Sequence, residues 1–68
     1  MQNPHRKLVQ RVREEFEEFP GLRLTVEEAA RYLAIDELTC RVVLTELSLA
    51  GVLARGMDDR FEMYAPAA

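Results

Sequence analysis

The sequence predicts a single, mainly helical α+β domain in which three helices precede a small C-terminal β-hairpin. Its 68 residues suffice for one domain, and the hydrophobic (49%) and charged (31%) fractions are typical of a globular chain. Apolar residues recur at helical spacing as far as Gly51 and alternate with other residues beyond it. Residues 1–68 are therefore predicted to fold as one domain, and the single cysteine excludes an internal disulfide.

The first helix is predicted over residues 4–19. Asn3 is suited to the N-cap and Pro4 to the first helical position, where a missing N–H costs nothing. One apolar face follows, formed by Leu8, Val9, Val12, Phe16 and Phe19. Pro20-Gly21 ends the helix, and residues 22–24 are predicted to form a small edge strand.

Two further helices are predicted over residues 25–33 and 37–50. Thr25 and Glu28 have the spacing of a capping box, in which each side chain binds a backbone N–H of the other. Asp36 is a good N-cap for the third helix, and the glycine after that helix supplies a left-handed stop. Two helices joined by a short turn form a helix-turn-helix unit.

The C-terminal segment is predicted to be a hairpin over residues 52–64. Its strands are Val52–Met57 and Arg60–Tyr64, with Asp58-Asp59 as the turn between them. On the second strand, alternate residues from Phe61 onward are expected to point inward. The predicted core comprises Leu8 or Val9, Val12, Phe16, Leu24, Ala29, Leu33, Cys40, Leu44, Leu47, Leu53 and Phe61.

Several residues between 12 and 64 carry a family resemblance. They are Glu15-Phe16, Pro20-Gly21-Leu22-Arg23-Leu24-Thr25, Glu28-Ala29, Arg31, Ile35-Asp36, Cys40, Leu44, Leu47, Gly51, Leu53, Asp59 and Arg60-Phe61. Through them the chain resembles the winged helix-turn-helix superfamily, and more narrowly a widespread group of short bacterial winged-helix proteins. That group has no settled activity. The superfamily implies a three-helix fold with a hairpin wing, DNA binding and transcription regulation in most members, and protein contact in a minority.

Charge is distributed unevenly along the chain. The net charge is −3 and the isoelectric point is near 5.0, yet residues 1–13 contain four basic side chains and no acidic one. An acidic chain is a poor general polyanion binder, although a local basic patch remains compatible with it. No apolar run has the length of a secretory signal or a membrane span, so a cytoplasmic protein without a membrane partner is expected.

No pattern of catalytic residues stands out. Cys40 aligns with Leu44 and Leu47 on one helix face and is expected to be a buried thiol, and the only histidine is His5. One cysteine and one histidine are too few for a zinc shell without several carboxylates, and no glycine-rich phosphate loop is present. We therefore expect no enzyme activity, no metal or other cofactor, and no small-molecule substrate.

The third helix distinguishes the candidate functions. If Cys40 faces the core, four residues lie on the opposite face: Leu38, Val42, Thr45 and Leu49. This outward face, with Arg41 beside it, is typical of a protein-interaction surface, and a homodimer is the simplest case. Burial of part of the face by a different helix rotation is the competing interpretation.

DNA binding is the alternative function. Its candidate residues are Arg31, Arg41, Arg55, Arg60, Arg6 and Lys7. Residues 23–48, which contain the helix-turn-helix, have three basic and five acidic side chains, and a negative recognition unit disfavours double-stranded DNA. Protein contact is therefore the preferred interpretation.

Overall fold

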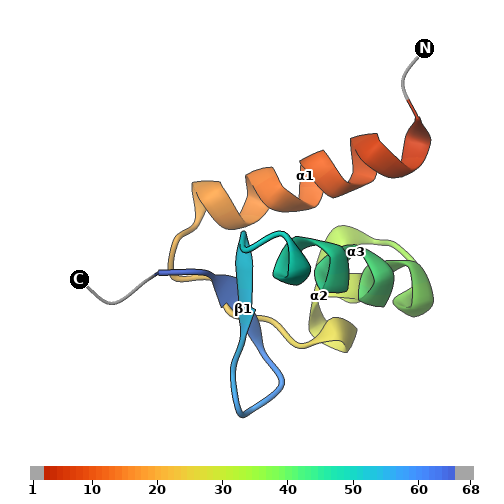
Figure 1. Ribbon diagram of the computed structural model, residues 1–68. Coiled ribbons are helices and arrows are strands. Elements are labelled where there is room, and N and C mark those ends of the chain that lie inside the picture. The colour runs from red at the N-terminus through yellow and green to blue at the C-terminus, as the bar shows by residue number, and fades with distance from the viewer. Residues whose placement is uncertain (1–2, 66–68) are drawn as a thin grey trace.

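The computed structural model describes residues 3–65, in which three helices precede a two-stranded antiparallel hairpin (Figure 1). In chain order the elements are α1 (Pro4–Glu18), α2 (Val26–Leu33), α3 (Glu37–Leu49), β1 (Leu53–Arg55) and β2 (Phe61–Met63). The predicted small α+β architecture is confirmed. The predicted range 1–68 also includes residues 1–2 and 66–68, which lie outside the described part.

The three helices begin at the predicted caps. The Asn3 side chain accepts a hydrogen bond from the backbone N–H of His5, and the Asp36 carboxylate accepts one from that of Thr39. Both hydrogen bonds of the capping box at the start of α2 are present. Helices α1 and α3 each end one residue earlier than predicted, and after α3 Gly51 adopts a φ of +78°, which favours glycine.

The hairpin is shorter than predicted, and its turn is longer. Leu53 pairs with Met63 and Arg55 with Phe61, so each strand has three residues. The predicted two-residue turn is wrong, because the backbone N–H of Gly56 donates to the carbonyl of Arg60 and leaves three residues between them. Asp59, the last of these, has a φ of +63°, as expected in a three-residue loop that ends with a left-handed residue.

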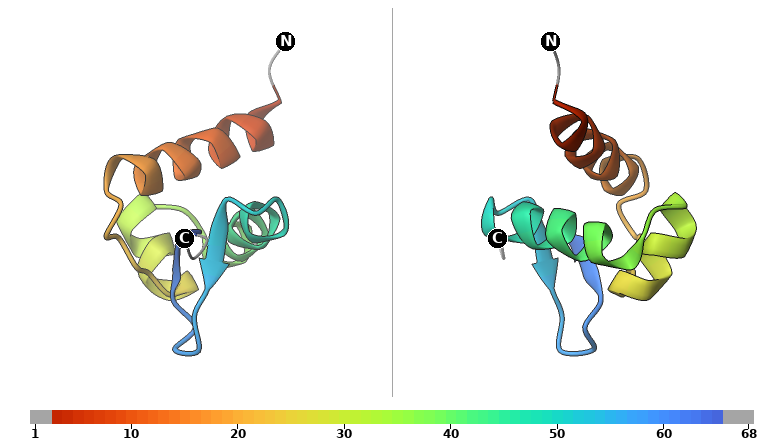
Figure 2. Two further views of the ribbon diagram at one scale, coloured as in Figure 1. Left: turned by 60° about the vertical axis from the view of Figure 1, so that its left-hand side comes forward. Right: turned by 90° about the vertical axis from the view of Figure 1, so that its right-hand side faces the viewer.

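The predicted edge strand is reduced to one residue. Leu24 forms an isolated antiparallel bridge with Phe61, with N–O distances of 3.1 and 2.7 Å. This bridge attaches the segment between α1 and α2 to the outer side of the hairpin. Figure 2 shows the resulting arrangement, with α1 on one side of α2 and α3 and the hairpin loop extending away from α1.

The core lies where the helices and the hairpin meet. Its buried residues are Val12, Phe16, Ala29, Ala30, Leu33, Cys40, Val43, Leu44, Leu47, Leu53 and Phe61. Leu24 and either Leu8 or Val9 were expected in the core, but all three are only partly buried beside it. Ala30 and Val43 were missed, although Val43 follows Cys40 by three residues, at helical spacing.

Candidate functional site

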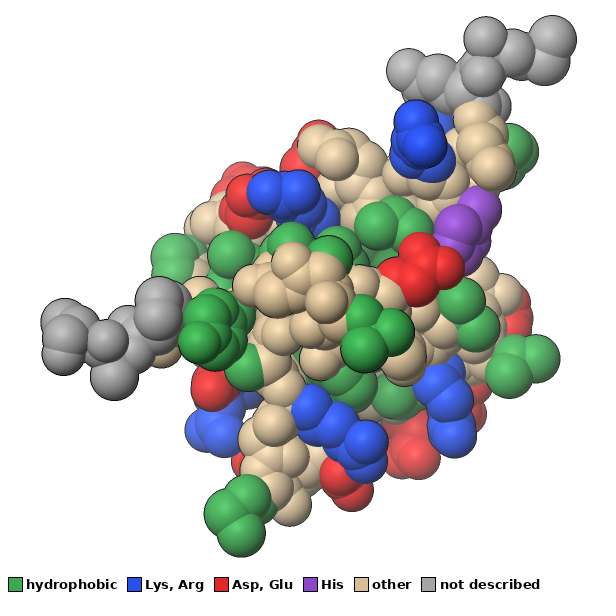
Figure 3. Space-filling model, viewed as in Figure 1, with side chains coloured by type: hydrophobic (Ala, Val, Ile, Leu, Met, Phe, Trp, Pro, Cys, Tyr) green, Lys and Arg blue, Asp and Glu red, His purple; other side chains and the backbone are tan. Residues whose placement is uncertain are grey.

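Helix α3 presents one face to the core and the opposite face to solvent. Cys40 and Leu44 are 0% exposed, whereas Leu38, Val42 and Leu49 are 72%, 44% and 84% exposed. The predicted helix orientation is confirmed, and the competing rotation is wrong. We call the exposed row of Leu38, Val42, Thr45 and Leu49 the outer stripe. Figure 3 looks onto this side and shows hydrophobic side chains distributed over α3 between polar and charged ones.

The outer stripe is flanked by charges of opposite sign. Arg41 lies on the flank toward the hairpin, where it lines a groove. Glu46 lies on the flank toward α1, and its Oε1 is 2.9 Å from Nε2 of His5. Within residues 3–65, Arg41 has neither an ion pair nor a side-chain hydrogen bond, so its charge is available to a partner.

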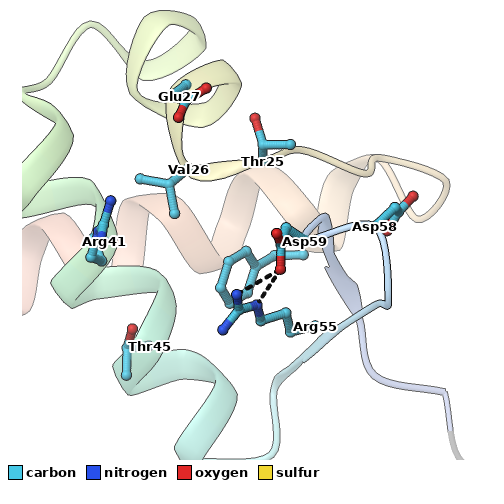
Figure 4. Close-up of a pocket in the computed structure, with 9 residues that line it drawn as sticks. Thr25, Val26, Glu27, Arg41, Thr45, Arg55, Asp58 and Asp59 are labelled. Atoms are coloured by element: carbon cyan, nitrogen blue, oxygen red, sulfur yellow. Dashed lines mark hydrogen bonds and ion pairs between the residues drawn. The ribbon is translucent and has the colours of Figure 1, made fainter.

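The groove beside the outer stripe lies between the start of α2, α3 and the hairpin. It has a volume of about 380 Å³, with Phe61 among its apolar lining residues. In Figure 4, Arg41 and Thr45 project from α3 across the groove from Arg55 and Asp59. Three acidic and two basic side chains line the groove in all, so its charge does not favour a phosphate.

The arginines of the hairpin are paired with carboxylates of the same chain. The Arg55 guanidinium lies 2.6 Å from Asp59, and Arg60 lies 3.4 Å from Glu28 and 3.5 Å from Asp58. Both arginines are candidates for DNA binding, and a DNA phosphate would have to displace or share these carboxylates. Each is partly exposed, so the pairs add little to stability but reduce the local positive potential.

The same network lowers the pKa values of two carboxyl groups. For Glu28 the largest cause is the hydrogen bond from the backbone N–H of Thr25, followed by the bond from Arg60. For Asp58 the largest cause is the hydrogen bond from the backbone N–H of Arg60. The positive charge of Arg23, whose guanidinium is 3.1 Å away, also lowers the pKa of Asp58. Both groups therefore keep their negative charge beside the arginines to a lower pH than ordinary carboxyl groups would.

The other candidate DNA contacts are on separate elements. Arg6 and Lys7 are exposed near the start of α1, and Arg31 is exposed near the end of α2. Figure 1 shows the start of α1 and the hairpin loop on opposite sides of α3. The structure therefore does not combine the six candidates into one patch.

Cys40 has the surroundings of a core residue. It is 0% exposed, and burial raises the pKa of its thiol, with smaller contributions from Glu37 and Asp36. The imidazole of His5 lies beside Glu46 instead. This contact connects residues 41 positions apart and had no signal in the sequence.

Comparisons with protein-family models, with curated proteins and with solved structures find no match to this chain. The resemblance to winged-helix proteins therefore remains a prediction. Across residues 3–65, no helix is long and apolar enough to cross a membrane. In the same range, no three His, Cys, Asp or Glu side chains are grouped so that they could hold a metal ion.

Proposed function

We propose that this chain is a non-enzymatic winged-helix module that acts through protein contact, with the outer stripe of α3 as its contact surface. The exposure of three aliphatic side chains on one helix face, Leu38, Val42 and Leu49, carries the proposal. The opposite face of α3 already supplies its core contacts, so the fold does not require aliphatic residues on the outer face. Exposed apolar side chains at i, i+4 and i+11 on one helix face form the kind of row by which a helix docks against a partner. Thr45 and Arg41 would form the polar rim.

The energies indicate that the aliphatic side chains of one copy alone would give only a weak contact. Full burial of a Leu or Val side chain contributes about 1.5–3 kcal/mol. Association costs about 4–15 kcal/mol in lost freedom of motion. Three aliphatic side chains from one partner therefore need a matching apolar surface on the other, and self-association supplies one because both copies contribute the same face.

DNA binding is the second candidate function. The resemblance to a superfamily of mostly DNA-binding proteins favours it. So does the position of Arg41 and Thr45, which line the groove between α3 and the hairpin. The ion pairs of Arg55 and Arg60 weigh against it, because salt-sensitive affinity for DNA depends on basic side chains that reach phosphates.

Two measurements on the full chain separate these functions. The first is sedimentation velocity over a wide concentration range for the wild type, Val42→Glu and Met57→Glu. Met57 is fully exposed in the hairpin turn, so its variant adds the same charge away from α3. We expect concentration-dependent association in the wild type and in Met57→Glu, and a monomer in Val42→Glu that keeps the wild-type circular dichroism spectrum.

The second measurement is fluorescence anisotropy with a random DNA duplex at two salt concentrations. Protein contact predicts no salt-sensitive binding at micromolar protein. Micromolar binding that is lost at higher salt, combined with equal association of Val42→Glu and Met57→Glu, would establish DNA binding and refute the proposal.

A further inference from the structure

The outer stripe has the spacing of a coiled-coil seam. Its members follow one another at intervals of four, three and four residues, so Leu38 and Thr45 correspond to d positions and Val42 and Leu49 to a positions of a heptad repeat. Among parallel coiled coils, a β-branched residue at a with a leucine at d favours two strands over three or four. Val42 and Leu38 fit this preference, whereas Leu49 at a and Thr45 at d do not. Since the other face of α3 is buried in the core, this seam is an additional one without a partner in the chain.

The charges beside the seam favour one orientation of such a pair. In the same register Arg41 occupies a g position and Glu46 the e position five residues later. In a parallel pair each g residue faces the e residue five positions further along the other helix, so Arg41 would face Glu46 of the partner subunit, twice by symmetry. In an antiparallel pair g faces g and e faces e, which would oppose like charges on both flanks.

The fold leaves α3 accessible for this contact. In the left view of Figure 2, α3 is seen nearly along its axis at one edge of the molecule, with α1 above it and the hairpin descending beside it. Its helical conformation is already secured by the Asp36 cap and by the core, so pairing would require no further ordering of the backbone. Arg41 has no ion pair within the described residues, and Glu46 contacts only His5 among the basic side chains there.

We propose that two copies of this chain associate through their α3 helices, side by side and parallel, about a two-fold axis along the helices. The outer stripes form the seam, and Arg41 of each copy pairs with Glu46 of the partner subunit. This inference rests on the proposed function, because it uses the same surface. It adds the identity of the partner, the orientation and the charge pair.

The test exchanges the charges, using Arg41→Glu, Glu46→Arg, the double variant and an equimolar mixture of the two single variants. Each single variant alone would oppose like charges on both flanks, and we expect its dimer to be about tenfold or more weaker than the wild-type dimer. In the mixture, one chain has two acids and the other two bases, so a heterodimer should form with near-wild-type affinity. The double variant should self-associate like the wild type. Sedimentation equilibrium measures all four.

A control and the failing outcomes complete the design. His5→Ala removes the contact that Glu46→Arg also removes, and it should leave association unchanged if Glu46 acts through Arg41. A wild-type chain that stays monomeric at millimolar concentration overturns the inference. The inference is also overturned if the mixture of single variants fails to recover association. If Val42→Glu is monomeric in that case, the outer stripe is still the contact surface and the proposed function stands. If Val42→Glu also associates like the wild type, the proposed function fails as well.

Discussion

Two neighbouring valines on α3 provide a matched test of how the helix is oriented. Val43 is 0% exposed and Val42 is 44% exposed, and both lie inside the same helix. Replacing each with alanine removes the same two carbons. The gain in helix propensity, up to about 0.7 kcal/mol, is also common to both changes and cancels in the comparison. The difference between the variants therefore reports the burial of the two side chains.

The structure sets the size of the expected difference. At Val43 the lost transfer energy is about 1.6 kcal/mol, and the cavity that remains brings the net loss of stability to about 2 kcal/mol. At Val42 only about half of the transfer energy is lost, no closed cavity forms, and the propensity gain offsets most of the remainder, which leaves less than about 0.5 kcal/mol. A domain of this size has about 3–5 kcal/mol in total, so Val43→Ala should lose roughly half of it.

Urea unfolding followed by circular dichroism at low micromolar protein measures these losses for the monomer. With a slope near 1 kcal/mol per M urea, we expect the midpoint to fall by about 2 M for Val43→Ala and by less than about 0.5 M for Val42→Ala. At high protein concentration Val42→Ala should in addition lose part of the concentration-dependent stability of the wild type. Equal midpoint shifts at low concentration would refute the assignment of the core and solvent faces of α3.

Two further predictions concern single groups. The buried Cys40 thiol, whose pKa is raised mainly by desolvation, should react with a thiol reagent far more slowly in the native protein than in urea, and equal rates would show that it is not in the core. Hydrogen bonds to Asp36 lower its pKa, first the bond from the Thr39 hydroxyl and then the bond from the Thr39 backbone N–H. The stability that this carboxylate contributes is therefore present above its ordinary pKa of 3.8 and is lost as the pH falls through its lower native pKa. Asp36→Asn keeps a capping oxygen, and its urea midpoint should fall less than that of the wild type between pH 5 and about 2; parallel curves would contradict this origin.

Local sequence signals predicted the helices accurately because the forces that start and end a helix act within a few residues. Asn3, Thr25 and Asp36 each bind a backbone N–H two or three residues away, as their positions indicated. The face of α3 that enters the core was also predictable, since apolar residues at helical spacing lie on one side whatever they pack against. The hairpin was less predictable. Its turn has Asp59 in a left-handed conformation with Arg55 paired to it, and its second strand is bridged at Phe61 to the distant Leu24.

In the candidate site, too, some features could be predicted from local sequence and others could not. The row of Leu38, Val42, Thr45 and Leu49 and the charge of Arg41 could be placed on one helix surface from their spacing alone, because a helix has a fixed period. Spacing alone could not show that Arg41 has no ion pair within the described residues. Nor could it show that Arg60 pairs with Glu28 or that His5 contacts Glu46. Those contacts join residues 32 and 41 positions apart.

The sequence by itself thus determined the number of helices, their bounds to within one residue, the residues that cap them, and the two faces of α3. Each of these depends on neighbours within one or two helical turns. Tertiary structure alone decided which arginines form ion pairs with carboxylates, and that Arg41, on one flank of the outer stripe, forms none within the described residues. Long-range ion pairs depend on how separate elements pack, and packing brings together side chains such as Arg23 and Asp58 that no local period relates.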